Sequence, residues 1–185
     1  MQLIPTTLKD VVILEPKVFG DKRGFFLEAY NEATFKSLGL PTHFVQDNHS
    51  GSRKGVLRGL HYQLQHPQGK LVRTLAGEIF DVAIDLRQHS PQFGQWAGVV
   101  LNTQNRRSLW IPPGFGHGFL VLSEFAEVSY KATDFYTPAF EHSILWNDPA
   151  IAIDWPLDGE PTLSEKDKAG LLLADAQTYP ESSCW

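Results

Sequence analysis

A period of two in residues 78–86 constrains the fold more than any other feature of the sequence. Phe80, Val82 and Ile84 alternate along this segment with positions that include Asp81 and Asp85. Successive side chains of an extended strand point to opposite faces, so the large apolar residues share one face and the acids share the other. The pattern predicts a half-buried β-strand, in which only one face packs against a core.

Short strands of the same kind recur along the chain. Five further segments are rich in β-branched and aromatic residues: 70–76, 96–101, 107–111, 117–123 and 127–136. Turn residues separate them, notably Gly77 and the run Pro112–Gly114, and 15 glycines and 12 prolines are spread along the 185 residues. This punctuation favours many short antiparallel strands. We therefore predict an all-β sandwich or barrel that forms a single domain over residues 1–185.

Helix signals are few. Asn31 is placed to cap a short helix that runs to Leu38, and Gly39 and Pro41 follow it. Ser164, with Asp167 three residues later, matches the start of a second helix that extends to about Leu173. The barrel should therefore carry a small helical appendage, mainly near its C-terminal end.

Composition excludes several classes of function. The net charge of −5 argues against a nucleic-acid binder or a protein that binds anionic membranes, although one phosphorylated ligand can still occupy a local cationic pocket. Cys184 is the only cysteine, so neither an internal disulfide nor a cysteine-based zinc site can form. No signal-peptide pattern opens the chain and no run of 18 apolar residues occurs, so we expect a soluble, cytoplasmic protein.

Two of the seven histidines lie in glycine-rich, aromatic surroundings. His61 follows Gly55 after five residues, and His117 ends the pattern Pro112-x-Gly114-x-x-His117. These patterns resemble the two motifs of the cupin barrel, a small jelly roll. Gln63 stands where metal-binding cupins have a second histidine, and Lys70 stands where they have a glutamate. Because a lysine cation opposes a metal cation, the resemblance implies a cupin barrel without a metal site.

A histidine and a lysine in a metal-free barrel suit the removal of a proton next to a carbonyl group. His61 can act as the base, and the Lys70 ammonium can stabilise the resulting enolate oxygen. Tyr130 is a candidate for the acid that returns a proton to the opposite face. Each residue also has a plain structural interpretation: Tyr130 as core filler, Lys70 as a surface lysine, and Asp167 as part of a helix cap.

Seven blocks in the same order along the chain carry a closer resemblance: residues 17–26, 44–50, 55–63, 69–73, 77–87, 110–119 and 163–167. Together they resemble the dTDP-4-dehydrorhamnose 3,5-epimerase family over about residues 3–175. The resemblance implies a cupin jelly roll and epimerisation of dTDP-4-dehydro-6-deoxy-D-glucose at C3 and C5 to dTDP-4-dehydro-β-L-rhamnose. It also implies no cofactor and a homodimer, to which the strand-like N-terminus could contribute by crossing to the partner.

The resemblance assigns roles to individual positions. His61 is the general base, Asp167 its partner in a dyad, Tyr130 the acid, and Lys70 lies near the keto oxygen. Tyr136 is placed to stack on thymine. The positions that match contacts to the nucleotide, pyrophosphate or sugar are Arg23, Glu28, Gln46, Asp47, Asn48, Arg58, Lys70, His117, Tyr136, Glu141 and Lys166. Guanidinium groups such as those of Arg23 and Arg58 suit phosphates because one fork binds two oxygens.

Two details and three rival functions stay open at this point. On a regular strand Arg58 and His61 would face opposite sides, so a bulge or bend at Gly59 is needed to bring both to one pocket. Phe135 stands where the family often has a tyrosine. The rivals are a single-site epimerase or 3,4-ketoisomerase acting on the same sugar nucleotide, a metal-dependent cupin enzyme, and a non-catalytic sugar-binding cupin.

Overall fold

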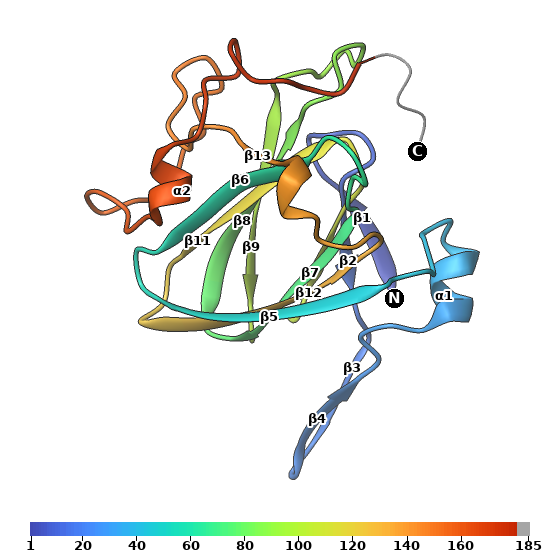
Figure 1. Ribbon diagram of the computed structural model, residues 1–185. Helices are drawn as coiled ribbons and strands as arrows, with labels where there is room; N and C mark the ends of the chain where they lie inside the picture. The colour runs from blue at the N-terminus through green and yellow to red at the C-terminus, as the bar shows by residue number, and fades with distance from the viewer. Residues whose placement is uncertain (181–185) are drawn as a thin grey trace.

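Two antiparallel sheets face each other in the computed structural model, which describes residues 1–180 (Figure 1). One sheet has the strand order β1-β2-β10-β7-β12-β5, and the other has the order β13-β6-β11-β8-β9. A separate hairpin, β3-β4, extends away from the two sheets. The all-β prediction is confirmed. Cys184 lies outside the described residues.

The strands are short, as the density of turn residues predicts. Their bounds are β1 Gln2–Pro5, β2 Val12–Glu15, β3 Val18–Asp21, β4 Gly24–Leu27, β5 Gln46–Arg53, β6 Leu57–Gln63, β7 Lys70–Ala76, β8 Glu78–Asp85, β9 Trp96–Asn102, β10 Ser108–Ile111, β11 Phe115–Val121, β12 Phe125–Ala132 and β13 Glu141–Ser143. The helices are α1 Glu32–Ser37, α2 Glu165–Lys168 and a 3₁₀ turn, Pro138–Phe140. None of the helices in residues 1–180 is long and apolar enough to cross a membrane.

Two strands lie about two residues earlier than predicted. β11 and β12 begin at Phe115 and Phe125, whereas the sequence pattern suggested 117 and 127. The turn between them is held by Ser123, whose hydroxyl accepts from the Glu78 N–H at 2.8 Å and donates to the Phe125 carbonyl at 2.8 Å. β12 ends at Ala132 rather than 136, and the chain bends at Thr133, whose side chain accepts a hydrogen bond from the Gly69 N–H at 2.8 Å.

Strand β8 is buried on both faces, so the prediction of a half-buried strand was wrong. Ile79 and Ala83 pack in the cluster between the two sheets, while Val82 and Ile84 pack in a second cluster under the C-terminal segments. Asp81 and Asp85 share the inner face with Ile79 and Ala83, and both are fully buried. An alternating pattern shows that two faces differ, but a barrel interior can hold acids if each finds a partner.

Both helices begin at their predicted caps. The Asn31 side chain accepts from the Thr34 N–H at the start of α1, and the Ser164 side chain accepts from the Asp167 N–H at the start of α2. α2 is shorter than predicted and ends at Lys168. Beyond it, the Leu171 N–H donates to the Ser143 carbonyl at 3.0 Å, so the chain pairs beside β13 instead of continuing the helix.

Candidate active site

An irregularity in β6 turns two functional side chains toward one pocket. His61 pairs with His117 of β11, but Arg58 pairs with Phe119, so the register shifts between them. Gly59 has a φ of +128°, which favours glycine, and a Cβ there would lie 2.4 Å from the Gly118 Cα. The predicted bulge at Gly59 is therefore present, and Arg58 and His61 both line the pocket.

His61 forms a dyad with Asp167 across the end of the barrel. The His61 Nε2 atom lies 2.5 Å from Asp167 Oδ1, and the second oxygen, Oδ2, accepts from the Ser164 hydroxyl at 2.7 Å. Burial raises the pKa of Asp167, but hydrogen bonds from His61 and Ser164 outweigh it and lower the pKa overall. Helix capping and the dyad therefore coexist, because each carboxylate oxygen has its own partner.

Lys70 is buried at the start of β7 and points into the same pocket. Burial lowers the pKa of its ammonium group to about 8, against the opposing charges of Glu141 and Asp81. Its Nζ atom makes no hydrogen bond or ion pair with another side chain in the described part of the chain and lies 5.8 Å from the centre of the Tyr130 ring. A desolvated cation of this kind can stabilise a negative oxygen strongly.

Tyr130 comes from β12, on the opposite sheet from His61. Burial raises the pKa of its phenol, so the hydroxyl stays protonated near neutral pH. The centre of its ring lies 6.4 Å from that of His117. A protonated phenol beside the pocket is a suitable proton donor.

Polar side chains at the mouth of the pocket hold one another in place. The Tyr136 hydroxyl donates to Glu141 Oε2 at 2.6 Å, and Lys166 forms an ion pair with the same carboxylate. The Asn48 Nδ2 donor is buried with no partner in residues 1–180, which leaves it available for a ligand. Glu141 thus links the exposed Tyr136 ring to helix α2, which also carries Asp167.

The pocket has a volume of about 330 Å³ and gathers most of the predicted site residues. It is lined by Gln46, Asn48, Arg58, His61, Lys70, His117, Tyr130, Tyr136 and Glu141, together with His49, Ser50, Gln68 and Phe119. Asp167 and Lys166 join through their contacts to His61 and Glu141. The site therefore combines an imidazole, a phenol and a buried ammonium group in a space that suits a small ligand.

Three predicted ligand residues lie elsewhere. Asp47 alternates with the inward-facing Gln46 and Asn48 of β5, so its exposed carboxylate pairs with Lys131 at 3.0 Å instead. Arg23, at the tip of the β3-β4 hairpin, is largely exposed and pairs with Asp21 at 2.5 Å. Glu28 follows the hairpin and accepts from Asn31. None of these three side chains lines the pocket of its own chain.

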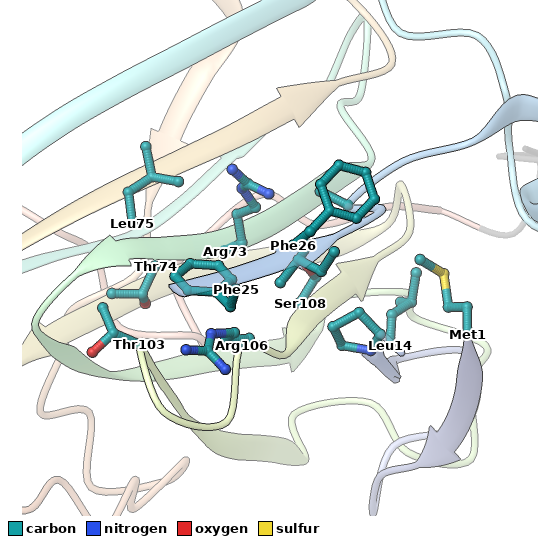
Figure 2. Close-up of a pocket in the computed structure, with 13 residues that line it drawn as sticks. Met1, Leu14, Phe25, Phe26, Arg73, Thr74, Leu75, Thr103, Arg106 and Ser108 are labelled. Carbon is teal, nitrogen blue, oxygen red and sulfur yellow. The ribbon is translucent and has the colours of Figure 1, made fainter. Parts of the chain in front are cut away.

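A second hollow lies where the hairpin meets the first sheet (Figure 2). It has a volume of about 350 Å³, and its lining includes Met1, Leu14, Phe25 and Phe26. The Arg106 guanidinium lies 3.8 Å from the centre of the Phe25 ring, as a cation–π pair. Phe25 and Phe26 nevertheless keep 60 % and 70 % of their surface exposed, which is unusual for two adjacent phenylalanines.

Comparison with known proteins decides the family. The family model described as dTDP-4-dehydrorhamnose 3,5-epimerase matches residues 5–175. The chain belongs to this family. Relatives of that name from Salmonella typhimurium and Pseudomonas aeruginosa are 60 % and 57 % identical, over 95 % and 97 % of this chain and 97 % and 100 % of theirs. The epimerase of Legionella pneumophila, solved with dTDP-4-keto-L-rhamnose, superposes with a TM-score of 0.95 at 51 % identity, covering 98 % of this chain and 99 % of that one.

Membership of this epimerase family confirms the predicted jelly-roll fold and carbohydrate-epimerase class. Four polar side chains at the site were not predicted from the sequence: His49, Ser50, Gln68 and Asp81. Gln68 lines the pocket, and Asp81 lies 2.7 Å from His117. One signal was present for Asp81, because the small Ala83 shares its face and small residues are typical of a tightly packed interior. Gln63, at the metal-ligand position of other cupins, donates to the carbonyls of His66 and Phe135 and so holds a loop.

Proposed function

We propose that this chain epimerises dTDP-4-dehydro-6-deoxy-D-glucose at C3 and C5, giving dTDP-4-dehydro-β-L-rhamnose. The observation that carries the proposal is the His61–Asp167 dyad, which shares a pocket with Lys70 and Tyr130. The 4-keto group acidifies the hydrogens on C3 and C5, and in a gluco-configured ring both lie on one face. One base can therefore serve both carbons.

Proton removal begins at His61. Asp167 accepts a hydrogen bond from Nε2 of His61. The other ring nitrogen, Nδ1, therefore carries the lone pair that takes the proton from the sugar carbon. The charge that develops on the keto oxygen is stabilised by the buried Lys70 ammonium. Tyr130 then delivers a proton from the opposite face, and the configuration at that carbon inverts. His61 then releases its proton to solvent and Tyr130 regains one, after which the same two steps occur at the second carbon with no net redox change.

The nucleotide is held by the remaining polar groups. Arg58, whose Nε donates to Ser52 at 3.0 Å, presents the rest of its guanidinium to the diphosphate. The half-exposed Tyr136 ring stacks on thymine, and the free Asn48 amide donates to the ligand. A metal-free mechanism and a cytoplasmic location, both expected from the sequence, stay predictions.

Solvent exchange tests the proposed reaction. In D₂O the protein should place one deuterium at C3 and one at C5 of the sugar, which NMR can follow. Exchange at one carbon alone would indicate a single-site epimerase, and transfer of the keto group to C3 would indicate a 3,4-ketoisomerase. Binding of dTDP without exchange would indicate a non-catalytic sugar-binding protein, and activity that depends on an added metal would contradict the mechanism.

The same proposal includes a homodimer in which the β3-β4 hairpin contacts the partner. Its support is the position of Arg23 and Glu28, which lie outside the pocket of their own chain, and the exposed Phe25 and Phe26 beside an apolar hollow. A second copy of the chain would cover these rings and bring Arg23 to the partner's pocket. Two ligand residues that serve no site in one chain then gain a function.

A further inference from the structure

Asp81 and Asp85 are both buried on strand β8, but their carboxylates accept very different numbers of hydrogen bonds. Asp85 accepts from the backbone N–H, Nε and Nη2 of Arg87 at 3.0, 2.9 and 2.7 Å, and from the Ser90 hydroxyl at 2.5 Å. Asp81 has one partner, His117, and its Oδ2 atom is buried with no hydrogen bond in the described part of the chain. A buried carboxylate normally saturates both oxygens. Asp85 therefore has a structural role, whereas Asp81 needs another explanation.

The contact with Asp81 decides which nitrogen of His117 carries a proton. His117 is almost fully buried, and burial lowers its pKa despite the neighbouring Asp81 carboxylate, so the ring is neutral near pH 7. An ionised carboxylate can only accept, so His117 Nε2, which lies 2.7 Å from Asp81 Oδ1, is the protonated nitrogen. The lone pair on Nδ1 is then available to the pocket, opposite His61 in the strand register.

The unsaturated oxygen of Asp81 also matters for Lys70. Asp81 contacts His117, which lines the same pocket as Lys70. Burial lowers the pKa of Lys70, the charges of Glu141 on β13 and Asp81 on β8 raise it, and the charge of Lys166 on α2 lowers it. Other titratable or charged side chains line the same pocket: His49 of β5, Arg58 and His61 of β6, His117 of β11, Tyr130 of β12 and Tyr136. Glu141 is already paired with Lys166 and Tyr136. Asp81 is therefore the negative charge near Lys70 that no other cation neutralises.

We propose that Asp81 is a positioning residue of this site: its carboxylate fixes the tautomer of His117 and keeps the Lys70 ammonium charged. The catalytic consequence rests on the proposed function, because only an enolate needs that cation. Asp81 does not line the pocket and acts through His117 and Lys70, which do. Replacing it by asparagine keeps the size of the side chain but removes its charge.

NMR of the ligand-free protein tests the proposal without any substrate. In the unmodified protein, long-range ¹H–¹⁵N spectra should show His117 protonated at Nε2, and the opposite tautomer would overturn the proposal. In Asp81→Asn the amide can donate as well as accept, so His117 should no longer be held in one tautomer and both tautomers should be seen. The Lys70 ¹³Cε titration, assigned with Lys70→Met, should move to lower pH by about one unit in Asp81→Asn. A titration that stays in place would refute the effect on Lys70.

The pH dependence of deuterium exchange gives the catalytic readout. Lys70 acts in its charged form, so exchange by the unmodified protein should fall as pH rises through about 8. In Asp81→Asn this fall should begin about one unit lower, so that the loss at pH 8.5 exceeds the loss at pH 6.5 by roughly sixfold. A uniform loss at all pH values would mean that Asp81 is merely structural.

Asp85→Asn is the matched control. It makes the same change on the same strand at the same burial. We expect it to leave unchanged the pH at which the exchange rate falls, even if it lowers the free energy of unfolding. If the unmodified protein exchanges no hydrogen with the keto sugar, the proposed function fails. The NMR measurements still decide the role of Asp81 in that case, so the two failures are distinguishable.

Discussion

At the scale of single residues, the site contains two histidine–aspartate pairs of similar geometry that differ in their exposure to solvent. Asp167 lies 2.5 Å from His61, and Asp81 lies 2.7 Å from His117. The first pair is partly open to the pocket, with 26 % of the His61 side chain exposed, whereas the second is closed at 6 %. A partly exposed imidazole can take a proton from a ligand and later release it to solvent. The His117 ring is nearly closed to bulk solvent, so we expect it to keep one tautomer rather than exchange protons with water.

Tyr130→Phe separates the two halves of the reaction. The change removes one hydroxyl and keeps the ring, so packing is preserved. The enolate should still form at His61 and regain a proton there with retention, so deuterium washes into the substrate. Epimerisation should slow by about 10²–10⁴-fold, the usual contribution of a positioned acid. NMR of the substrate pool in D₂O measures both rates.

His61→Asn is the comparison for the tyrosine variant. It removes the base, so exchange and epimerisation should disappear together while dTDP binding persists. An equal loss of both rates in Tyr130→Phe would show that the tyrosine serves binding or proton removal. The acid would then have to be another group, such as a water molecule.

At the scale of elements, helix α2 does more for the site than its single turn suggests. Ser164 accepts from the Asp167 N–H at 3.2 Å and donates to Asp167 Oδ2 at 2.7 Å, so one residue caps the helix and orients the dyad carboxylate. Lys166 of the same turn pairs with Glu141 at the pocket mouth. The turn therefore connects His61, through Asp167, to Glu141 at the mouth of the pocket.

Ser164→Ala should lower both stability and activity. Loss of a helix cap costs about 1 kcal/mol of unfolding free energy. The variant also loses a hydrogen bond that holds the pKa of Asp167 down, so this pKa should rise and the carboxylate should orient His61 less well. Ser123→Ala is the matched control, because it removes a serine hydroxyl that also accepts from a backbone N–H, that of Glu78 at 2.8 Å, but lies outside the pocket. Thermal unfolding and exchange rates should show similar destabilisation in both variants but a slower reaction only in Ser164→Ala.

The elements also show what a sequence can and cannot predict. Features that depend on local backbone chemistry were predictable. They are the two helix caps, the turns at Gly77 and Pro112–Gly114, and the bulge at Gly59. The burial of Asp81 was not, because alternation does not distinguish solvent from a barrel interior. The early end of α2 was missed because it depends on pairing of Leu171 with Ser143, far apart in sequence. Family resemblance named Arg23 and Glu28 as ligands but could not place them.

At the scale of the whole molecule, the hairpin is the part that one chain does not explain. Figure 1 shows β3-β4 extending away from both sheets, and its four-residue strands pair only with each other. An isolated two-stranded hairpin is at best marginally stable in water. Exposed phenylalanines and a charged tip on such an element make sense if a second chain packs against it. Dimers whose two chains carry different defects can test whether the hairpin serves the partner's pocket.

Mixed dimers of Arg23→Ala and His61→Asn should recover activity that neither variant has alone. If Arg23 serves the partner's pocket, the Arg23→Ala chain keeps its own His61 and receives an intact Arg23 from the His61→Asn chain. One good site then forms in each mixed dimer. Each mixed dimer has one working site of two, so a pool of mixed dimers alone should show about half of the wild-type activity in a closed two-fold assembly. Differently tagged chains, co-expressed and purified on both tags, give the measurement. If Arg23 acts within its own chain, both sites of a mixed dimer stay defective, and no activity returns. Phe26→Asp in both chains supplies the control. It replaces an exposed ring by a charge, which should separate the subunits and abolish the recovery of activity.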